Sequence, residues 1–338
     1  MQLYLFLIFS LFIFSCLELF TQKNEYIRTI QKIYISIVFV LLTFNRKNSD
    51  YKNYLKVFDG EKNIVSEKGY LFFVKILKIL GGNHNLILLI LGCLFFFVIF
   101  YLYKKKYEIT FIFLYLIYLF MYDINQIRNL FCILFILIGI KFLGKNKKYF
   151  YLIFNILAVS FQRLGYIYFI FYFLQKLKLR NYLKVIGMLF MGGIFFIPIF
   201  KKMMIILFQD KAMFYFAQTP RFGMLLYYIF IVMDIFLLKK LYYKNNKELL
   251  LKFILFPIIF LPYSILSIEL IRRIWRNTLY LKWFYFLKLL ENENYKKKVI
   301  VYFVLFSQQF MILSIEFFKD PRRVVDLISQ IKNINFYI

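Results

Sequence analysis

Apolar residues follow one another in long runs along nearly the whole 338-residue chain, and polar residues gather in the short segments between them. Most runs are about 15 to 20 residues long, which suits a helix crossing the ~30 Å hydrocarbon core of a bilayer. Because lipid offers the backbone no hydrogen bonds, such runs must be helical. We therefore expect an all-α, polytopic integral membrane protein with about 11–12 transmembrane helices, forming a single membrane domain over residues 1–338. The runs fall near residues 3–20, 33–44, 85–103, 109–122, 127–143, 149–175, 183–200, 222–238, 253–268, 277–289 and 299–316.

The composition excludes a water-soluble fold. The chain is 62% hydrophobic and 23% aromatic, which leaves too little polar surface to cover a soluble protein. Its net charge of +28 would suggest a nucleic-acid partner in a soluble protein. Here the lysines cluster in short segments between apolar runs, which is the positive-inside pattern of a membrane protein. The first run lacks a basic flank and a small-residue cleavage site, so we interpret it as a span rather than a signal peptide.

The run 149–175 is long for one span and contains "FQRLG" at its middle. A single helix there would place the lysine-rich loops on its two sides in different compartments, against the positive-inside rule. A break at residues 162–165 places both loops in the cytoplasm. With that break and an external N-terminus, nine of the eleven arginines lie outside: Arg46, Arg128, Arg163, Arg221, Arg272, Arg273, Arg276, Arg322 and Arg323.

The external arginines predict a surface that holds an anion, because a guanidinium offers a planar fork of donors to phosphate or carboxylate. Anchoring at the end of a span remains the alternative for any single arginine. Arg272 and Arg276 share a helix face at i, i+4, where like charges repel. An anion should therefore compensate them.

The longest external segment covers residues 45–85 and contains the densest external carboxylates, which are Asp50, Asp59, Glu61 and Glu67. Its second half, residues 70–80, places Leu71, Val74, Leu77 and Lys78 on one helix face. This pattern predicts an amphipathic helix on the membrane surface. Glu67 precedes that helix, so a solvated capping role is the alternative to a functional one.

The stretch "MYDINQIRNLF" lies between two apolar runs and predicts a helix start at the external boundary. We expect Asn125 to cap the following helix, with Gln126 and Arg128 in its first turn. A cation at a helix N-terminus opposes the helix dipole, so helix stability does not explain Arg128. An anion bound by both the helix end and the guanidinium does.

Metal and disulfide chemistry have little support in the sequence. Cys16, Cys93 and Cys132 lie within apolar runs without paired spacing, and His84 is the one histidine. We therefore expect no disulfide framework, no metal site and no cofactor, and we interpret His84 as structural.

The order of these motifs resembles the EpsG family, the Wzy-type membrane proteins of bacterial polysaccharide assembly. The resembling features are "D-Y-x-x-Y" from Asp50, "E-x-G-Y" from Glu67, "Q-x-R" from Gln126, the short pair around "FQRLG", and a late "RRIWRN". They cover roughly residues 45–290. One departure concerns "FQRLG", because family members commonly have a histidine where this chain has Gln162.

The resemblance implies polymerisation of undecaprenyl-diphosphate-linked oligosaccharide repeat units at the external face of the bacterial cytoplasmic membrane. It implies no nucleotide sugar and no metal, with a flippase and a chain-length regulator as partners. The lysine pattern described above gives no reason to expect a nucleic-acid partner. We expect Arg128, with one or more of Arg163, Arg272, Arg273 and Arg276, to bind the diphosphate, and Asp50 or Glu67 to act as base or sugar ligand. Tyr51, Gln126 and Gln162 are further candidate substrate-binding residues.

Two other functions remain open at the level of sequence. A lipid-linked oligosaccharide flippase or exporter needs charges lining a path through the bilayer. Most runs carry none at their middles, and Asp234 is the clearest exception. An O-antigen-ligase-like enzyme, which moves finished glycan onto another acceptor, uses the same polyprenyl-linked substrate, and the sequence does not separate it from a polymerase.

Overall fold

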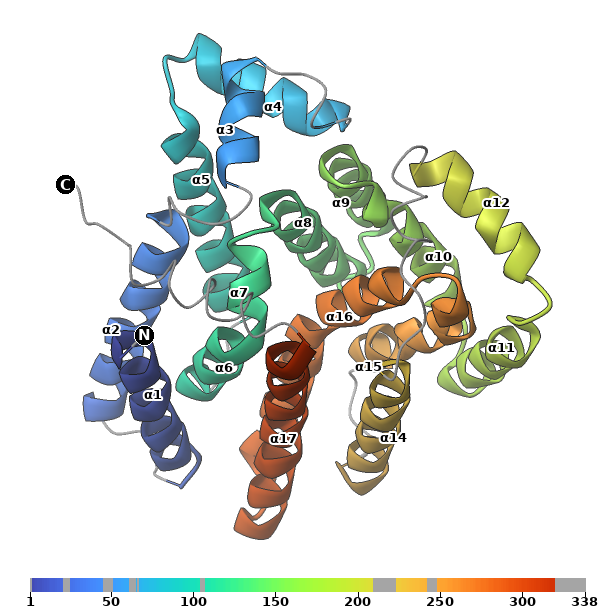
Figure 1. Ribbon diagram of the computed structural model, residues 1–338. Helices are drawn as coiled ribbons and strands as arrows, with labels where there is room; N and C mark the ends of the chain where they lie inside the picture. Colours follow the sequence, from blue (N-terminus) through green and yellow to red (C-terminus); the bar gives the residue numbers. More distant parts are fainter. Residues whose placement is uncertain are drawn as a thin grey trace. The chain divides into compact units, whose positions relative to one another are not determined.

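The computed structural model describes residues 2–20, 25–44, 51–60, 65, 67–103, 107–208, 223–241 and 248–319. All regular elements in these ranges are helices (Figure 1). The helices form two compact units, residues 1–162 with 290–338 and residues 163–289. The all-α prediction is therefore confirmed for the described residues, and the single membrane domain stays a prediction.

The first unit contains most of the longer helices. Two of them continue through a π-helical segment: α5 over Phe97–Leu102, and α6 over Tyr115–Leu119 into α7. The helices are α1 (Gln2–Phe20), α2 (Glu25–Thr43), α3 (Tyr51–Asp59), α4 (Lys68–Ile79), α5 (His84–Phe96), α6 (Glu108–Leu114), α7 (Phe120–Asp123), α8 (Ile127–Leu143), α9 (Lys148–Phe161) and α17 (Tyr295–Lys319), preceded by a 3₁₀ turn at Leu290–Asn292.

The second unit begins with a 3₁₀ turn at Arg163–Tyr166 and has a second 3₁₀ segment at Phe256–Ile265, which contains two prolines. Its α-helices are α10 (Ile167–Leu174), α11 (Leu179–Gly192), α12 (Ile197–Phe208), α14 (Gly223–Leu241), α15 (Glu248–Leu255) and α16 (Ile268–Leu289).

The predicted break in the run 149–175 is confirmed. Helix α9 ends at Phe161, and Gln162 is extended, with φ −151° and ψ 123°. The prediction of one continuous span over residues 183–200 is wrong. The helices Leu179–Gly192 and Ile197–Ile206 meet there at an angle of 95°. Gly193 lies at this bend, where a Cβ atom would come within 2.8 Å of Pro262. Glycine therefore permits a close approach that a larger residue would prevent.

Among the described residues, three helices are long and apolar enough to cross a membrane: Glu25–Thr43, His84–Leu102 and Glu248–Ile265. The bent pair of α11 and α12 makes a fourth if it counts as one span. Four further apolar helices are shorter, at Phe6–Leu19, Lys148–Phe161, Arg163–Leu174 and Tyr228–Leu237. The larger number of spans expected from the sequence stays a prediction.

In the first unit, described residues that flank the lysine-rich segments lie together. The Glu18 carboxylate at the end of α1 accepts hydrogen bonds from two backbone N–H groups at the start of α6, at 3.0 and 2.8 Å. Lys141, near the end of α8, lies 5.2 Å from the ring of Tyr103. Lys298 in α17 lies 5.9 Å from the ring of Tyr107. Four segments far apart in the sequence thus meet at one end of the unit.

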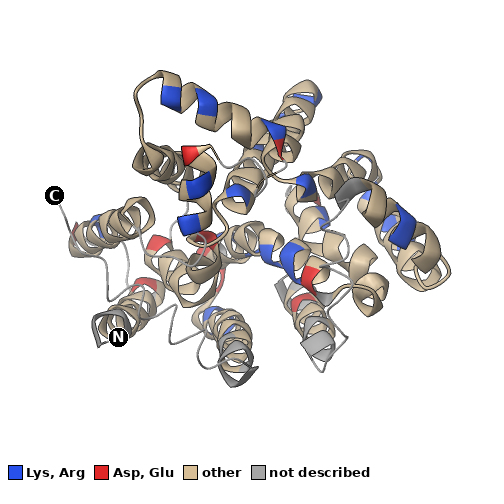
Figure 2. Cartoon of the chain, turned by 45° about the horizontal axis from the view of Figure 1, so that its top comes forward, with Lys and Arg blue, Asp and Glu red and all other residues tan. Residues whose placement is uncertain are grey.

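Arg128 and Lys141 mark opposite ends of α8, which separates them by about 20 Å at 1.5 Å per residue. The lysines of α3 and α4 lie on the helices that surround Arg128, so the separation of lysine from arginine across the membrane stays a prediction. Figure 2 colours the basic residues blue and the acidic residues red on both units.

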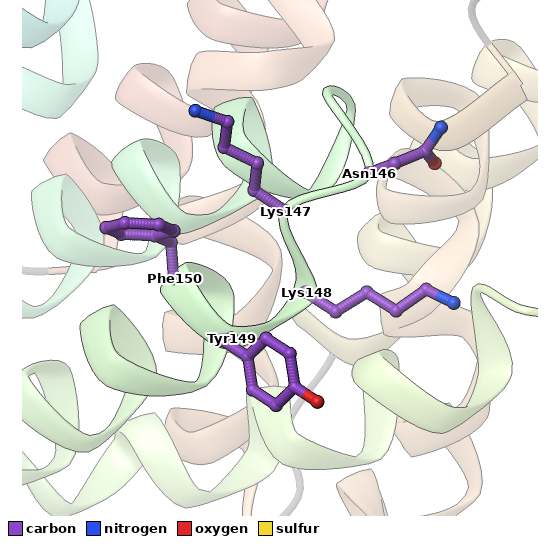
Figure 3. A pocket seen from close by; sticks show the side chains of 5 residues that line it. All are labelled: Asn146, Lys147, Lys148, Tyr149 and Phe150. Atoms are coloured by element: carbon purple, nitrogen blue, oxygen red, sulfur yellow. The ribbon is translucent and has the colours of Figure 1, made fainter.

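A pocket lies at the turn between α8 and α9, at the end of α8 opposite Arg128, which we call the lysine end of the first unit. It is lined by Asn146, Lys147, Lys148, Tyr149 and Phe150 (Figure 3). Lys147 turns toward Phe150, with its ammonium 5.8 Å from the ring, whereas Lys148 and Asn146 point the other way. These polar groups therefore diverge rather than point toward one position in the pocket.

Candidate functional site

An ion pair between Glu67 and Arg128 is the centre of the candidate site in the first unit. Their side chains are 3% and 17% exposed, respectively, so the pair is largely removed from water. The two residues are 61 positions apart in the sequence. The structure thus joins the carboxylate and the arginine that sequence reasoning placed separately on the external face.

Glu67 occupies the residue before α4, with an extended backbone at φ −79° and ψ 108°. Its side chain does not cap the helix, and the residue is only 5% exposed. The alternative of a solvated capping residue is therefore wrong, because the carboxylate turns away from the helix end toward Arg128.

Gly69 allows α4 to lie directly against the end of α9. A Cβ atom at this position would lie 2.2 Å from Oγ of Ser160 and 2.8 Å from its carbonyl oxygen. Both distances are too short for any side chain, so only glycine fits here. This contact explains the glycine of "E-x-G-Y", since the close approach fixes the helix that follows Glu67.

The predicted helix at residues 70–80 is confirmed as α4, but its buried face differs from the expected one. Tyr70, Val74 and Leu77 are buried, so Tyr70 takes the place expected for Leu71. The opposite face exposes Phe72, Ile76 and Ile79 together with lysines. A position of α4 on the membrane surface stays a prediction.

Arg128 is the second residue of α8. The expected capping role of Asn125 is wrong, because its side-chain amide donates to the carbonyl of Met121 at 2.7 Å and Gln126 occupies the N-cap position. The Nε–H of Arg128 is buried without a hydrogen-bond partner among the described residues. The guanidinium therefore keeps donor capacity beyond its bond to Glu67.

Aromatic side chains of α3 and α4 surround the ion pair. The ring of Tyr54 lies 5.9 Å from Cζ of Arg128, a cation–π distance, and 5.9 Å from the ring of Tyr70. Burial raises the pKa of Tyr70. Tyr51 lies one helical turn before Tyr54, and its hydroxyl donates to Asn85 Oδ1 at 3.5 Å. The sequence motif "D-Y-x-x-Y" thus places both tyrosines on one face, although Asp50 lies outside the described residues.

Gln162 is close to this site through its neighbour in the chain. The ring of Phe161 lies 6.2 Å from that of Tyr70, and the carbonyl of Gln162 is 3.9 Å from the Cys132 thiol. Its Oε1 atom is buried without a partner among the described residues. Sequence reasoning named Gln162 as a site residue, whereas it named Tyr54 and Tyr70 only as members of the motifs "D-Y-x-x-Y" and "E-x-G-Y" and interpreted His84 as structural.

The late arginines lie in the second unit, on α16. Glu269 forms ion pairs with Arg272 and with Arg273, the latter at 2.8 Å. Burial alone would raise the pKa of Glu269, but the arginines bring it below its ordinary value. An anion from the chain itself thus compensates part of the expected repulsion. Arg276 is 1% exposed, and Arg163 begins the 3₁₀ turn after the break. Joint contact of these arginines with the substrate of Arg128 stays a prediction.

Asp234, the acidic residue within the run 222–238, is also paired. Its carboxylate lies 2.6 Å from the ammonium of Lys282 on α16, and both side chains are buried. Pairing removes most of the cost of a charge in an apolar environment. The pair therefore explains how a carboxylate is accommodated among the apolar side chains of this run.

Within the described ranges, no group of three or more histidine, cysteine and acidic side chains could hold a metal ion, and the three cysteines are free thiols. The profile of the EpsG family matches residues 28–328. No curated protein and no solved structure matches the chain. The family match covers most of the sequence and includes both residues of the ion pair. The chain therefore belongs to the EpsG family, which implies a membrane-associated protein with a polysaccharide polymerase-like function.

Proposed function

We propose that this protein polymerises undecaprenyl-diphosphate-linked oligosaccharide repeat units at the external face of the bacterial cytoplasmic membrane. The growing glycan leaves its lipid diphosphate and joins a hydroxyl of the next lipid-linked unit, without a nucleotide sugar. The observation that carries the proposal is the buried Arg128–Glu67 pair, which unites the two groups that this transfer requires.

The leaving group requires a cation. Negative charge accumulates on the diphosphate as its bond to the anomeric carbon breaks, so a positioned guanidinium stabilises the transition state more than the ground state. The free Nε–H of Arg128 and its position at the start of α8 both favour an anion there. A contribution of Arg163, Arg272, Arg273 and Arg276 at the diphosphate stays a prediction.

The acceptor requires a base. Its hydroxyl oxygen bonds to the anomeric carbon and gives its proton to Glu67, while the bonding electron pair departs with the lipid diphosphate. The Glu67 carboxylate is paired with Arg128. A diphosphate that competes for the guanidinium would release the carboxylate, so that the base becomes available when the leaving group is in place.

The proposal predicts a defined glycan profile in cells. A strain lacking the gene should be complemented with wild-type protein, Glu67→Gln, Arg128→Lys and the control Tyr149→Phe, whose residue is 82% exposed at the lysine end of the unit. The first two variants should leave single repeat units on the acceptor, because the amide of Glu67→Gln cannot take a proton and the lysine of Arg128→Lys lacks the planar fork. The control should restore full polymer.

Other outcomes would separate the alternatives. Long chains that accumulate on the carrier lipid would indicate a ligase, and repeat units retained on the cytoplasmic side would indicate an exporter. Full-length polymer from both Glu67→Gln and Arg128→Lys, at wild-type protein levels, would show that the pair is not the reaction centre.

A further inference from the structure

His84 is a buried histidine whose polar atoms lack partners. It begins α5 and is 2% exposed. Neither Nδ1 nor Nε2 has a hydrogen-bond partner among the described residues. A neutral imidazole has one donor and one acceptor, and burying both without partners is unfavourable. A histidine with a purely structural role would normally satisfy at least one of them.

Aromatic rings enclose this imidazole on several sides. Tyr51 lies edge-on to it at 4.8 Å between ring centroids, and Phe58 lies edge-on at 6.3 Å. Tyr54 stacks at 6.5 Å. The ring of Tyr54 also contacts the guanidinium of Arg128. His84 is therefore separated from the Glu67–Arg128 pair by the width of one aromatic side chain.

We propose that His84, with Tyr51 and Tyr54, forms a subsite for a sugar ring of the oligosaccharide; this inference rests on the proposed function. One sugar hydroxyl can donate to one ring nitrogen of His84 while another accepts from the second. The C–H faces of the sugar pack against the tyrosine rings. Binding sites with an apolar, aromatic lining and a few fixed polar groups suit such ligands.

A phosphate group suits this subsite less well. A neutral imidazole offers it a single N–H. The ammonium of Lys78 lies 5.1 Å from the ring of Phe58, but the carboxylate of Asp59 also acts on the imidazole, so these two charges oppose each other. The guanidinium of Arg128, which can bind a phosphate with several donors, lies on the far side of Tyr54. In this proposal, the diphosphate of the substrate binds at Arg128, and one of its sugars binds at His84.

The test uses the full-length protein in nanodiscs and two separate probes. The first probe is the free oligosaccharide released from the host's own surface polysaccharide, without lipid or phosphate, and its binding is followed by saturation-transfer NMR at millimolar concentration. The second is farnesyl diphosphate, which lacks sugar. The variants are His84→Phe, His84→Gln, which retains a donor and an acceptor, Arg128→Lys and the control Tyr149→Phe.

The subsite predicts that His84→Phe weakens oligosaccharide binding by about tenfold or more, because the polar contacts to the hydroxyls are lost. Farnesyl diphosphate binding should stay unchanged in this variant, and His84→Gln should retain part of the saccharide binding. The melting temperature of His84→Phe without sugar should equal or exceed that of the wild type, because an unsatisfied buried group is removed.

Three results would overturn the subsite. The first is unchanged saccharide binding by His84→Phe, and the second is the absence of a saccharide signal from the wild type. The third is a lower melting temperature of His84→Phe, with a loss of saccharide binding that is explained by unfolding alone. The proposed function fails separately, if Arg128→Lys changes neither farnesyl diphosphate binding nor the polymer profile. The subsite would stand in that case if saccharide binding still depended on His84.

Discussion

The energetic coupling between Glu67 and Arg128 gives a quantitative prediction. Replacing one partner of a buried ion pair leaves the other charge buried and uncompensated, which costs about 3–5 kcal/mol. Because the Arg128 side chain retains 17% exposure, we expect Glu67→Leu and Arg128→Leu each to cost about 3 kcal/mol, the lower end of that range. The double variant contains neither charge and should cost less than the sum of the two single variants, with a coupling of about 1–3 kcal/mol.

The assay is reversible unfolding of the four proteins in mixed micelles, with helix content followed against the fraction of denaturing detergent. Polymer formation is measured on the same preparations. The double variant should regain stability but remain inactive, because the chemical groups are missing even where the packing is repaired. Additive costs would show that the pair does not interact in solution, and an active double variant would remove both residues from the mechanism.

Three further predictions concern the surroundings of the site. Gly69→Ala should lower the free energy of unfolding by about 1–3 kcal/mol, because its Cβ atom would overlap Ser160. The matched control is Gly187→Ala, whose Cβ atom would have no neighbouring atom within 4 Å, so it should be neutral or slightly stabilising in the same thermal unfolding assay. Glu18→Ala should lower the melting temperature, since two buried N–H groups of α6 lose their acceptor at a cost of about 1–3 kcal/mol each, and an unchanged value would contradict the capping role. Glu269 has a lowered pKa, so its contribution to stability is present above its ordinary pKa of about 4.5 and is lost as the pH falls below that value. Glu269→Gln should therefore weaken the dependence of the melting temperature on pH between pH 7 and pH 3.

The sequence predicted the helices well, because an apolar run of given length is a local property. Residues 127–143 were expected as one helix, and α8 has those bounds. The break at Gln162 was predicted because one continuous helix would place the two lysine-rich loops on opposite sides of the membrane, and α9 does end before Gln162. The bend between α11 and α12 was missed, because the run was judged by its length and apolar character, whereas the turn signal in it is the pair Gly192-Gly193.

The candidate site was only partly predictable. Sidedness and motif order indicated Arg128 and Glu67 as separate candidates, but their pairing depends on how α4 packs against α9 through Gly69. No periodicity in the sequence reports such a tertiary contact. For the same reason, His84 was interpreted as structural, since its aromatic surroundings come from a helix that lies more than twenty residues earlier in the chain.

The most direct test of the central claim is the reaction of purified protein in nanodiscs with isolated lipid-linked repeat units, in the absence of nucleotide sugars. Product length and released lipid diphosphate are measured together for the wild type and for Glu67→Gln at equal protein content. The account predicts that the wild type forms polymer and releases one lipid diphosphate for each linkage, and that Glu67→Gln forms neither product at a measurable rate. Polymer formed by Glu67→Gln at the wild-type rate would contradict it.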